Sequence, residues 1–238
     1  PATVRCCIQN SKPIASPKTM RFAHWPVAAS RSFRYNRATM NENPHYPPGE
    51  KKRLVVGISG ATGIVYGIRL LEVLREAEVE THLVITRPGL MTLGYETDIT
   101  REALFALADH VYAPNDMGAA ISSGSLLTLG MVVAPCAVKS AAEIATGATQ
   151  TLLTRAADVT LKEHRRLVLM VRESPLHTGH LRTLAEASDI GAIIMPPMPA
   201  FYPKPETIED MVDHTIGRVL DLFAIEHSLS KRWTGKPE

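Results

Sequence analysis

Five short segments of this sequence place hydroxyl groups, cations and a carboxylate directly after runs of apolar residues. The segments are residues 59–63 (SGATG), Thr86-Arg87, residues 137–140 (AVKS), Arg172-Glu173 and Phe201-Tyr202. Hydroxyl and cationic groups can hold more than one anion, and Glu173 is the carboxylate among them. Any single segment could be a helix cap or a solvated ion pair. The five together favour a site that binds an anionic ligand beside a proton-transfer group.

The first of these segments is glycine-rich and lies between an apolar run, residues 54–58, and a helical pattern over residues 64–74. A strand, a tight turn and a helix in this order direct backbone N–H groups and a positive helix end at a phosphate. Gly57, Gly60 and Gly63 are three residues apart, whereas the dinucleotide fingerprint has a two-then-three spacing. An NAD-binding sheet would also end its second strand in an acid, where this chain has Thr86-Arg87. The pattern predicts a phosphate-bearing ligand other than NAD.

The elements that must position these segments alternate along the chain. Strands are predicted over residues 54–58, 80–85, 131–135, 167–171 and 192–195, and helices over 64–74, 88–93, 101–108, 140–145, 152–162, 177–187 and 207–224. Residues 95–98, 114–125 and the proline-rich 196–205 are predicted loops. This alternation predicts an α/β fold with a doubly wound, mostly parallel sheet, in which ligands bind at the carboxyl ends of the strands.

The charge distribution separates the first fifty of the 238 residues from the rest. Residues 1–50 carry seven Lys and Arg but only Glu42 and Glu50, a net charge of +5, while the remainder carries a net −3. An Arg- and Ser-rich, acid-poor leader is typical of mitochondrial transit peptides, and a disordered extension without targeting function is the alternative. We therefore expect a leader over 1–50 and one catalytic domain over 51–238. The mildly acidic body gives no reason to expect nucleic acid as a partner.

Several other chemistries find no support in the sequence. The three cysteines, Cys6, Cys7 and Cys136, lack metal-ligand spacing, and Cys136 is expected to be a small buried side chain. His177 and His180 have no third ligand, and no Gly-x-Ser-x-Gly hydrolase motif occurs. No apolar run approaches the roughly 20 residues of a membrane span. We therefore expect neither a metal site nor a hydrolase nor a membrane-spanning segment.

Seven motifs, in order and covering about residues 51–235, resemble the UbiX-type flavin prenyltransferases, which include the fungal phenylacrylic acid decarboxylase accessory proteins. The motifs are GISGATG (57–63), YETD (95–98), SSGS (122–125), PC (135–136), RAADVTLKE (155–163), RESP (172–175) and PAFY (199–202). The resemblance implies a flavodoxin-like homo-oligomer with sites near subunit interfaces. It implies transfer of a dimethylallyl group from dimethylallyl monophosphate to N5 and C6 of reduced FMN, without a metal. The prenylated FMN would then serve a UbiD-type decarboxylase.

The resemblance also implies roles for individual residues. FMN would be held by Gly60, Ala61, Thr62, Thr86, Ala137, Val138, Lys139, Ser140 and Arg172; the donor phosphate by Lys162, Tyr202 and Arg218; Glu96 and Glu173 would be acid–base groups, and Arg155 a supporting cation. Three positions depart from the family pattern. Thr62 and Thr86 replace common serines and keep the hydroxyl, whereas Ala137 replaces a common serine and removes one phosphate donor.

The chemistry of the assigned residues agrees with this interpretation. Breaking an allylic C–O bond to phosphate places negative charge on the leaving group, which Lys, Arg and Tyr donors stabilise. The Asp-Asp-x-x-Asp motif that holds Mg²⁺ in prenyl-diphosphate enzymes is absent, and residues 209–213 (EDMVD) are better explained as a helix start. Two alternatives remain: an FMN-dependent oxidoreductase or decarboxylase of a related family, and a non-catalytic flavin-binding subunit. A pure binder would not need all three phosphate donors.

Overall fold

The fold is taken from a computed structural model, which describes residues 46, 49–230, 232 and 235. All of them belong to one compact unit, Asn36–Glu238. Most of the predicted leader, including Cys6 and Cys7, lies outside the described residues. Its assignment as a leader stays a prediction.

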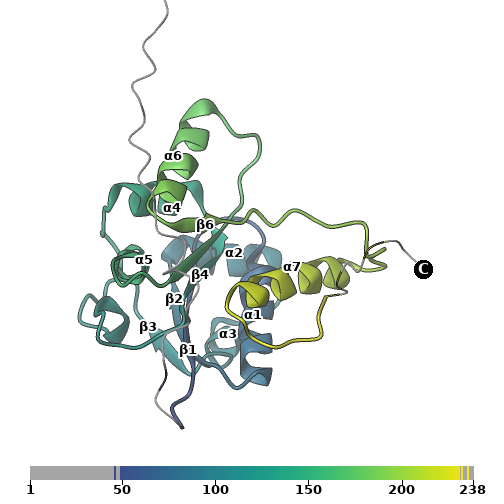
Figure 1. Ribbon diagram of the computed structural model, residues 1–238, viewed down its shortest axis with the longest axis horizontal. Helices are drawn as coiled ribbons and strands as arrows, with labels where there is room; N and C mark the ends of the chain where they lie inside the picture. Colours follow the sequence, from purple (N-terminus) through teal and green to yellow (C-terminus); the bar gives the residue numbers. More distant parts are fainter. Residues whose placement is uncertain (1–45, 47–48, 231, 233–234, 236–238) are drawn as a thin grey trace, which may run out of the picture. The chain divides into compact units, whose positions relative to one another are not determined.

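Six parallel strands form a single sheet in the described part of the chain (Figure 1). The strands are β1 (Arg53–Ile58), β2 (Glu80–Ile85), β3 (His110–Tyr112), β4 (Gly130–Cys136), β5 (Arg166–Val171) and β6 (Ala192–Ile194). Their order is β3-β2-β1-β4-β5-β6, so the chain reverses its direction of winding between the neighbours β1 and β4. This is the order of doubly wound nucleotide-binding sheets, and it confirms the predicted fold class.

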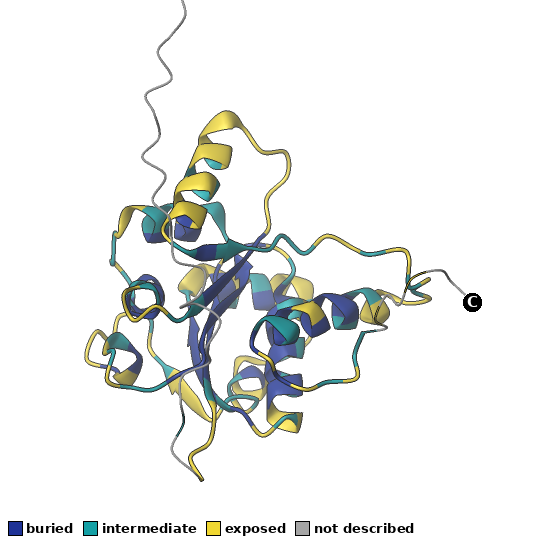
Figure 2. Ribbon diagram, in the orientation of Figure 1, coloured by how far each residue is buried: buried dark blue, intermediate teal, exposed yellow. Residues whose placement is uncertain are grey.

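Helices cover both faces of the sheet. They are α1 (Ile64–Glu76), α2 (Arg87–Glu96), α3 (Arg101–Phe105), α4 (Val138–Thr146), α5 (Leu152–Lys162), α6 (Thr178–Asp189) and α7 (Ile208–Leu222), with a 3₁₀ turn at Ala120–Ser122. Alternate residues of β1 serve the two faces: Val56 and Ile58 pack with α1 and α7, and Val55 packs with α4 and α5. Figure 2 shows the resulting buried strands between half-exposed helices.

The structure corrects four details of the sequence-based assignment. Strand β3 was missed because its three residues are mostly exposed and give no apolar run. Helix α2 extends to Glu96, so Tyr95 and Glu96 belong to a helix and not to a loop. Helix α3 ends at Phe105, three residues earlier than expected. Helix α4 begins at Val138, two residues before the predicted start, because Ala137 has the extended backbone of an N-cap.

Tyr46 ties the chain before β1 to the domain. Its hydroxyl donates to the Leu127 carbonyl over 3.4 Å and accepts from the Arg53 amide over 3.2 Å. Its ring also packs against the apolar core. The folded unit therefore includes Tyr46, which the predicted boundary at residue 50 had assigned to the leader.

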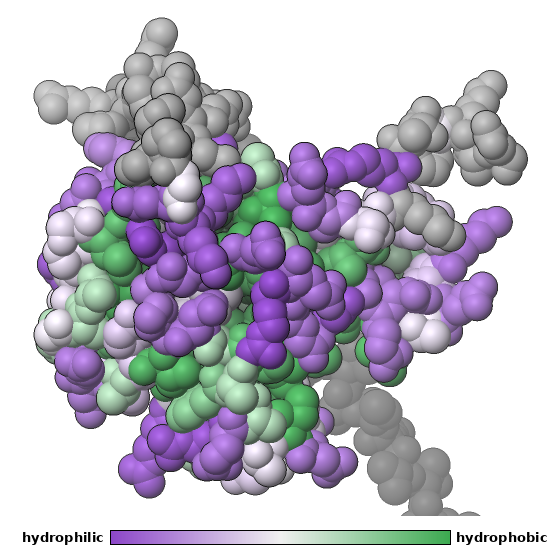
Figure 3. All heavy atoms as spheres, turned by 90° about the horizontal axis from the view of Figure 1, so that it is seen from below, coloured by the Kyte–Doolittle hydropathy of each residue, from purple (hydrophilic) through white to green (hydrophobic). Residues whose placement is uncertain are grey.

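The surface carries large apolar side chains next to polar ones. Figure 3 shows the two kinds interspersed on the face it presents. Among the described residues, the most exposed large apolar side chains include Tyr95, Met198, Phe201 and Ile208. No helix in the described part of the chain is both long enough and apolar enough to cross a membrane.

Candidate active site

A buried serine joins the two central strands where the winding reverses. The Ser59 hydroxyl, only 1% exposed, donates to the Pro135 carbonyl over 3.0 Å and accepts from the Ala137 amide over 2.7 Å. The Ser59 amide donates to the same carbonyl over 3.1 Å. These bonds fix the carboxyl ends of β1 and β4 side by side. The crevice of a doubly wound sheet opens at this point.

A cavity of about 320 Å³ lies at this edge of the sheet. It is lined by Gly60, Thr86, Arg87, Pro88, Pro114, Asn115, Ala137, Lys139, Ser140, Glu143 and Thr151. Five of the nine residues assigned to FMN are among them. A volume of this size is at the lower end for cofactor and ligand pockets.

Close packing at the cavity rim explains why position 60 is a glycine. A Cβ atom on Gly60 would lie 2.3 Å from the Cβ of Pro88, so no larger residue fits there without a shift. Pro88 belongs to the first turn of α2, which Thr86 caps by accepting from the Gly89 amide over 3.1 Å. The hydroxyl of Thr86 is therefore used by the helix as well as lining the cavity.

Two of the helix starts at this edge, those of α1 and α4, differ in how their backbone N–H groups are satisfied. The Glu96 carboxylate accepts from the Gly63 amide over 2.8 Å and from the Ile64 amide over 3.0 Å at the start of α1. The sequence predicted that this helix end faces a phosphate; it faces a carboxylate of the chain itself. At α4 no side chain caps the N-terminus within the described residues. The open N–H groups of α4 border the cavity and are the ones that suit an anion.

Cys136 is the last residue of β4, two positions before α4 begins. It is fully buried, and burial raises the pKa of its thiol to about 12. A thiol with this pKa stays protonated at neutral pH and is a poor nucleophile. This agrees with the prediction of a small buried side chain.

Arg172 and Glu173 follow β5 at the same edge. The Arg172 amide donates to the Cys136 carbonyl over 3.1 Å, which holds this segment next to the α4 start. Both side chains are exposed, and no ion pair joins them in the described part of the chain. The Glu173 carboxylate accepts from the Ser174 amide over 3.1 Å.

Tyr202 and Arg218 come from the proline-rich segment and from α7, and both approach His214. The Tyr202 hydroxyl lies 3.3 Å from His214 Nε2. Burial and the nearby Arg218 guanidinium hold the pKa of His214 below its usual value. Arg218 also pairs with Asp221 over 2.8 Å. His214 was not predicted as a site residue, because a lone histidine in a helical pattern gives no functional signal.

Lys162 lies on α5, which packs in a different core cluster from α7, the helix that carries Arg218. It ends α5, whose first residue Leu152 donates its amide to the cavity-lining Pro114 over 2.8 Å. Ten residues of helix separate the two ends by about 15 Å. The Lys162 ammonium pairs with the Glu163 carboxylate. Arg155, on the same helix, donates to the Ser122 carbonyl over 3.3 Å and pairs with Asp158 over 2.7 Å.

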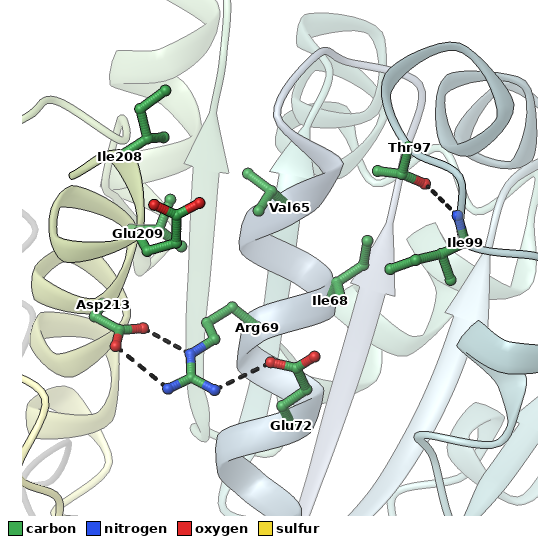
Figure 4. Close-up of a pocket in the computed structure, with 10 residues that line it drawn as sticks. Val65, Ile68, Arg69, Glu72, Thr97, Ile99, Ile208, Glu209 and Asp213 are labelled. Carbon is green, nitrogen blue, oxygen red and sulfur yellow. Dashed lines mark hydrogen bonds and ion pairs between the residues drawn. The ribbon is translucent and has the colours of Figure 1, made fainter.

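A second groove, of about 420 Å³, lies between α1 and α7 (Figure 4). Val65 and Ile208 give it apolar walls, and Arg69 crosses it to pair with Asp213 over 2.6 Å and with Glu72 over 3.0 Å. These ion pairs raise the pKa of Arg69 above its usual value. Because Arg69, the cation in its lining, is already paired with Asp213 and Glu72, we do not assign the reaction to this groove.

Glu80, His82 and His110 form a cluster of potential metal-ligating groups at the β2–β3 edge. The Nε2 atoms of both histidines lie 3.2 Å from the same carboxylate oxygen, which also accepts from Arg53 Nε over 3.3 Å. The two rings are stacked, with centroids 4.7 Å apart. The two histidine nitrogens approach the same carboxylate oxygen, as they do in a hydrogen-bonded network. Metal ligands would instead be arranged around the position of the ion. We therefore assign no metal here.

Comparison with known proteins gives a family match and close relatives. Residues 42–220 match the family described as Flavoprotein. The chain is 54% identical over 187 residues to flavin prenyltransferase UbiX of Escherichia coli K12, covering 77% of this chain and 99% of the relative. It is 48% identical over 188 residues to the mitochondrial flavin prenyltransferase PAD1 of Saccharomyces cerevisiae, covering 79% and 78% of the two chains.

Two solved structures are similar over the whole described domain. AnUbiX (PadA1), in complex with FMN and dimethylallyl pyrophosphate, matches with a TM-score of 0.78 and 47% identity, covering 79% of this chain and 100% of that one. A dodecameric FMN-dependent UbiX-like decarboxylase from Escherichia coli O157:H7 matches with a TM-score of 0.75 and 48% identity, covering 77% and 100%.

Proposed function

The chain belongs to the Flavoprotein family and, within it, to the flavin prenyltransferases, and from this premise we propose how its own residues perform the reaction. Its activity is the transfer of a dimethylallyl group to reduced FMN, at N5 and C6. FMN is both the ligand of the cavity and the prenyl acceptor. We propose that the residues assigned to the site carry out this transfer without a metal ion.

The observation that carries the FMN site is the cavity at the β1–β4 crevice. Gly60, Thr86, Ala137, Lys139 and Ser140 line it. The uncapped start of α4 offers backbone N–H groups, which replace the hydroxyl that Ala137 lacks. We propose that the FMN phosphate binds at this helix end. Ala61 and Val138 adjoin lining residues in sequence, Thr62 lies two positions after Gly60, and Arg172 follows β5 at the same edge; they complete the proposed set.

We propose that dimethylallyl monophosphate is the donor, held by Lys162, Tyr202 and Arg218. The related structure contains the pyrophosphate, so the length of the phosphate chain is our proposal. These three side chains provide two cations and a hydroxyl donor, which stabilise the charge that grows on the departing phosphate. Their role does not require them to contact FMN.

The placement of the donors on opposite faces of the sheet argues for a site shared between copies. Tyr202 and Arg218 both approach His214, whereas Lys162 lies at the far end of α5 from the cavity. We propose that Lys162 of one copy joins Tyr202 and Arg218 of another. The dodecameric relative supports an assembly in which copies meet, and homo-oligomers usually repeat one interface by symmetry.

Glu173 and Glu96 receive different roles in this proposal. Glu173 is exposed at the sheet edge, so its carboxylate can exchange a proton with the flavin system. Glu96 accepts two backbone N–H bonds at the start of α1, both with the same carboxylate oxygen. To act as a base, it would use its other oxygen or release this cap. Arg155 supports the loop before β4 through the Ser122 carbonyl.

We also propose a recipient for the product and a cellular location for the protein. A UbiD-type decarboxylase would take up the prenylated FMN. Mitochondrial targeting is supported by the leader composition and by the yeast relative, which is described as mitochondrial. The bacterial relatives give no information on targeting by the leader. The family match begins at residue 42 and so leaves most of the leader uncovered.

Mass spectrometry of the flavin tests the proposed activity. The full chain is incubated anaerobically with reduced FMN and dimethylallyl monophosphate, and the flavin is extracted. We expect the mass of FMN to increase by one dimethylallyl unit, with release of inorganic phosphate. An unchanged flavin that is nevertheless bound would favour the non-catalytic flavin-binding subunit. If the chain instead decarboxylates an added carboxylic acid and leaves FMN unprenylated, the oxidoreductase or decarboxylase alternative is favoured.

A further inference from the structure

A buried histidine contacts one of the residues that we assign to the donor phosphate. His214 is 8% exposed, and its Nε2 lies 3.3 Å from the Tyr202 hydroxyl oxygen. The two rings meet edge to face, with centroids 5.4 Å apart and an interplanar angle of 84°. We propose that His214 is a positioning residue: it donates from Nε2 to the Tyr202 oxygen and thereby aims the phenol hydrogen at the phosphate of the prenyl donor. This inference rests on the function proposed above.

The direction of the hydrogen bond decides whether His214 helps or competes. A neutral imidazole carries one hydrogen, on Nδ1 or on Nε2. With the hydrogen on Nε2, His214 donates to the phenol oxygen and does not take the phenol's own hydrogen. With the hydrogen on Nδ1, His214 accepts that hydrogen from Tyr202, and the phosphate then loses a donor.

The surroundings of Nδ1 favour the first arrangement. Nδ1 of His214 is buried and has no hydrogen-bond partner among the described residues. A hydrogen on Nδ1 would therefore be a buried donor without an acceptor, which folded proteins rarely contain. Placing the hydrogen on Nε2 satisfies it with the Tyr202 oxygen.

The position of His214 also suits a supporting role. It stands on α7 one turn before Arg218, so both residues extend from the same side of the helix. His214 also lines a polar cavity of about 310 Å³ beneath the proline-rich segment, together with Pro203 and Lys204. The imidazole thus links the helix that carries Arg218 to the loop that carries Tyr202. It would keep the two phosphate donors in a fixed relation to each other.

Substitution of His214 tests the proposal through the donor kinetics. His214→Leu removes the hydrogen-bond donor, and we expect kcat/KM for dimethylallyl monophosphate to fall about tenfold, mainly through kcat, because a misdirected donor acts on the transition state. His214→Gln keeps an N–H donor at similar reach, and we expect a rate within about threefold of the parent. The Kd of FMN should change less than about twofold in both variants, since FMN is bound elsewhere.

A double-mutant cycle separates positioning from packing. Tyr202→Phe should lower the rate by about 10². If His214 acts through the Tyr202 hydroxyl, adding His214→Leu to Tyr202→Phe should lower the rate no further. Thr215→Val, at a neighbouring buried position whose hydroxyl donates to the Met211 carbonyl 2.8 Å away, is the matched control and should keep the parent rate.

Three kinetic results would overturn the proposal: parent rates in His214→Leu, no rescue by His214→Gln, or a further tenfold loss in the double variant. Nitrogen NMR of the parent protein tests it without substitution, and a hydrogen on Nδ1 would also overturn it. Failure of the parent to prenylate FMN would instead contradict the proposed function. The two failures are therefore distinguishable.

Discussion

The FMN cavity and the donor-phosphate residues differ in how much of the assembly is needed to build them. The cavity is formed by one chain, because the loops after β1, β2 and β4 meet at one sheet edge. Lys162 and Arg218 lie on α5 and α7, which pack in the core clusters on opposite faces of the sheet. In our proposal a flavin site can thus exist in a single protomer, whereas a complete transfer site requires neighbouring copies. Binding and catalysis should therefore respond differently to substitution.

The largest effect is expected from Arg218→Ala. Loss of one charged donor at the departing phosphate should lower the prenylation rate by about 10²–10³, while the Kd of FMN changes little. Arg218→Lys should be only a partial substitute, since a point charge replaces a two-pronged donor. Arg232→Ala is the matched control, because Arg232 pairs with the same Asp221 carboxylate over 2.7 Å but has no assigned phosphate role. A parent rate in Arg218→Ala would reduce Arg218 to a surface cation.

Mixing two inactive variants tests whether the transfer site is shared. Lys162→Ala and Arg218→Ala chains are co-expressed in equal amounts so that they assemble together. If Lys162 and Arg218 of one site come from different copies, random assembly should restore about a quarter of the sites. If both residues come from one copy, no site contains both native side chains. Activity that stays at the level of the separate variants would therefore contradict the shared site.

A smaller effect on the cavity is expected from Ser59→Ala. The substitution leaves the half-buried Ala137 amide without its acceptor, which should cost about 1–3 kcal/mol of unfolding free energy. FMN binding should weaken as the β1 and β4 ends separate. Urea denaturation and flavin titration measure the two effects. Ser123→Ala, an exposed serine that contacts only its own loop, should change stability by less than about 0.5 kcal/mol.

The pH dependence of stability tests the β2–β3 edge, which leads into the Pro114–Asn115 wall of the cavity. Burial and the neighbouring His110 lower the pKa of His82 from its usual 6.5. Below pH 6.5 the unfolded chain therefore binds a proton before the folded chain does, so stability falls as pH falls. We expect the unfolding midpoint in urea to decrease between pH 7.5 and 5.5.

His82→Gln should flatten this slope in part, because His214 has a lowered pKa as well. The control is His164→Asn, at an exposed position with a φ of 54° that asparagine tolerates. It should leave the slope unchanged. An identical slope in His82→Gln would mean that His82 does not control acid sensitivity.

The smallest effect is expected from removing the leader. Chains beginning at Asn43 and at Lys51 should both prenylate FMN at the parent rate, since neither deletion reaches an assigned site residue. The shorter chain lacks Tyr46 and its bonds to Leu127 and Arg53, so it should be about 1 kcal/mol less stable. Loss of activity in the Asn43 chain would show that the leader contributes to the assembly.

The sequence predicted the cavity better than the transfer site, for a physical reason. Local patterns encode strands and their ends, so the positions after β1 and β4 could be located from the order of the residues alone. The cap by Glu96 could not be located, because it joins residues 33 positions apart through one side chain. His214 was missed because a lone histidine in a helical pattern gives no functional signal. The resemblance to a family supplied Lys162, Tyr202 and Arg218, because the hydrophobic periodicity of the chain does not show which side chains converge on a donor phosphate.

The serine that joins β1 to β4 has a consequence for the order of events during synthesis. Ser59 is made early, but both of its partners, the Pro135 carbonyl and the Ala137 amide, are made 76 and 78 residues later. At roughly 5–20 residues per second, a ribosome needs several seconds to cover that interval. Until then the cavity lacks the start of α4, where we propose that the FMN phosphate binds. Cofactor loading therefore cannot begin on the first βα unit and must wait for the middle of the chain.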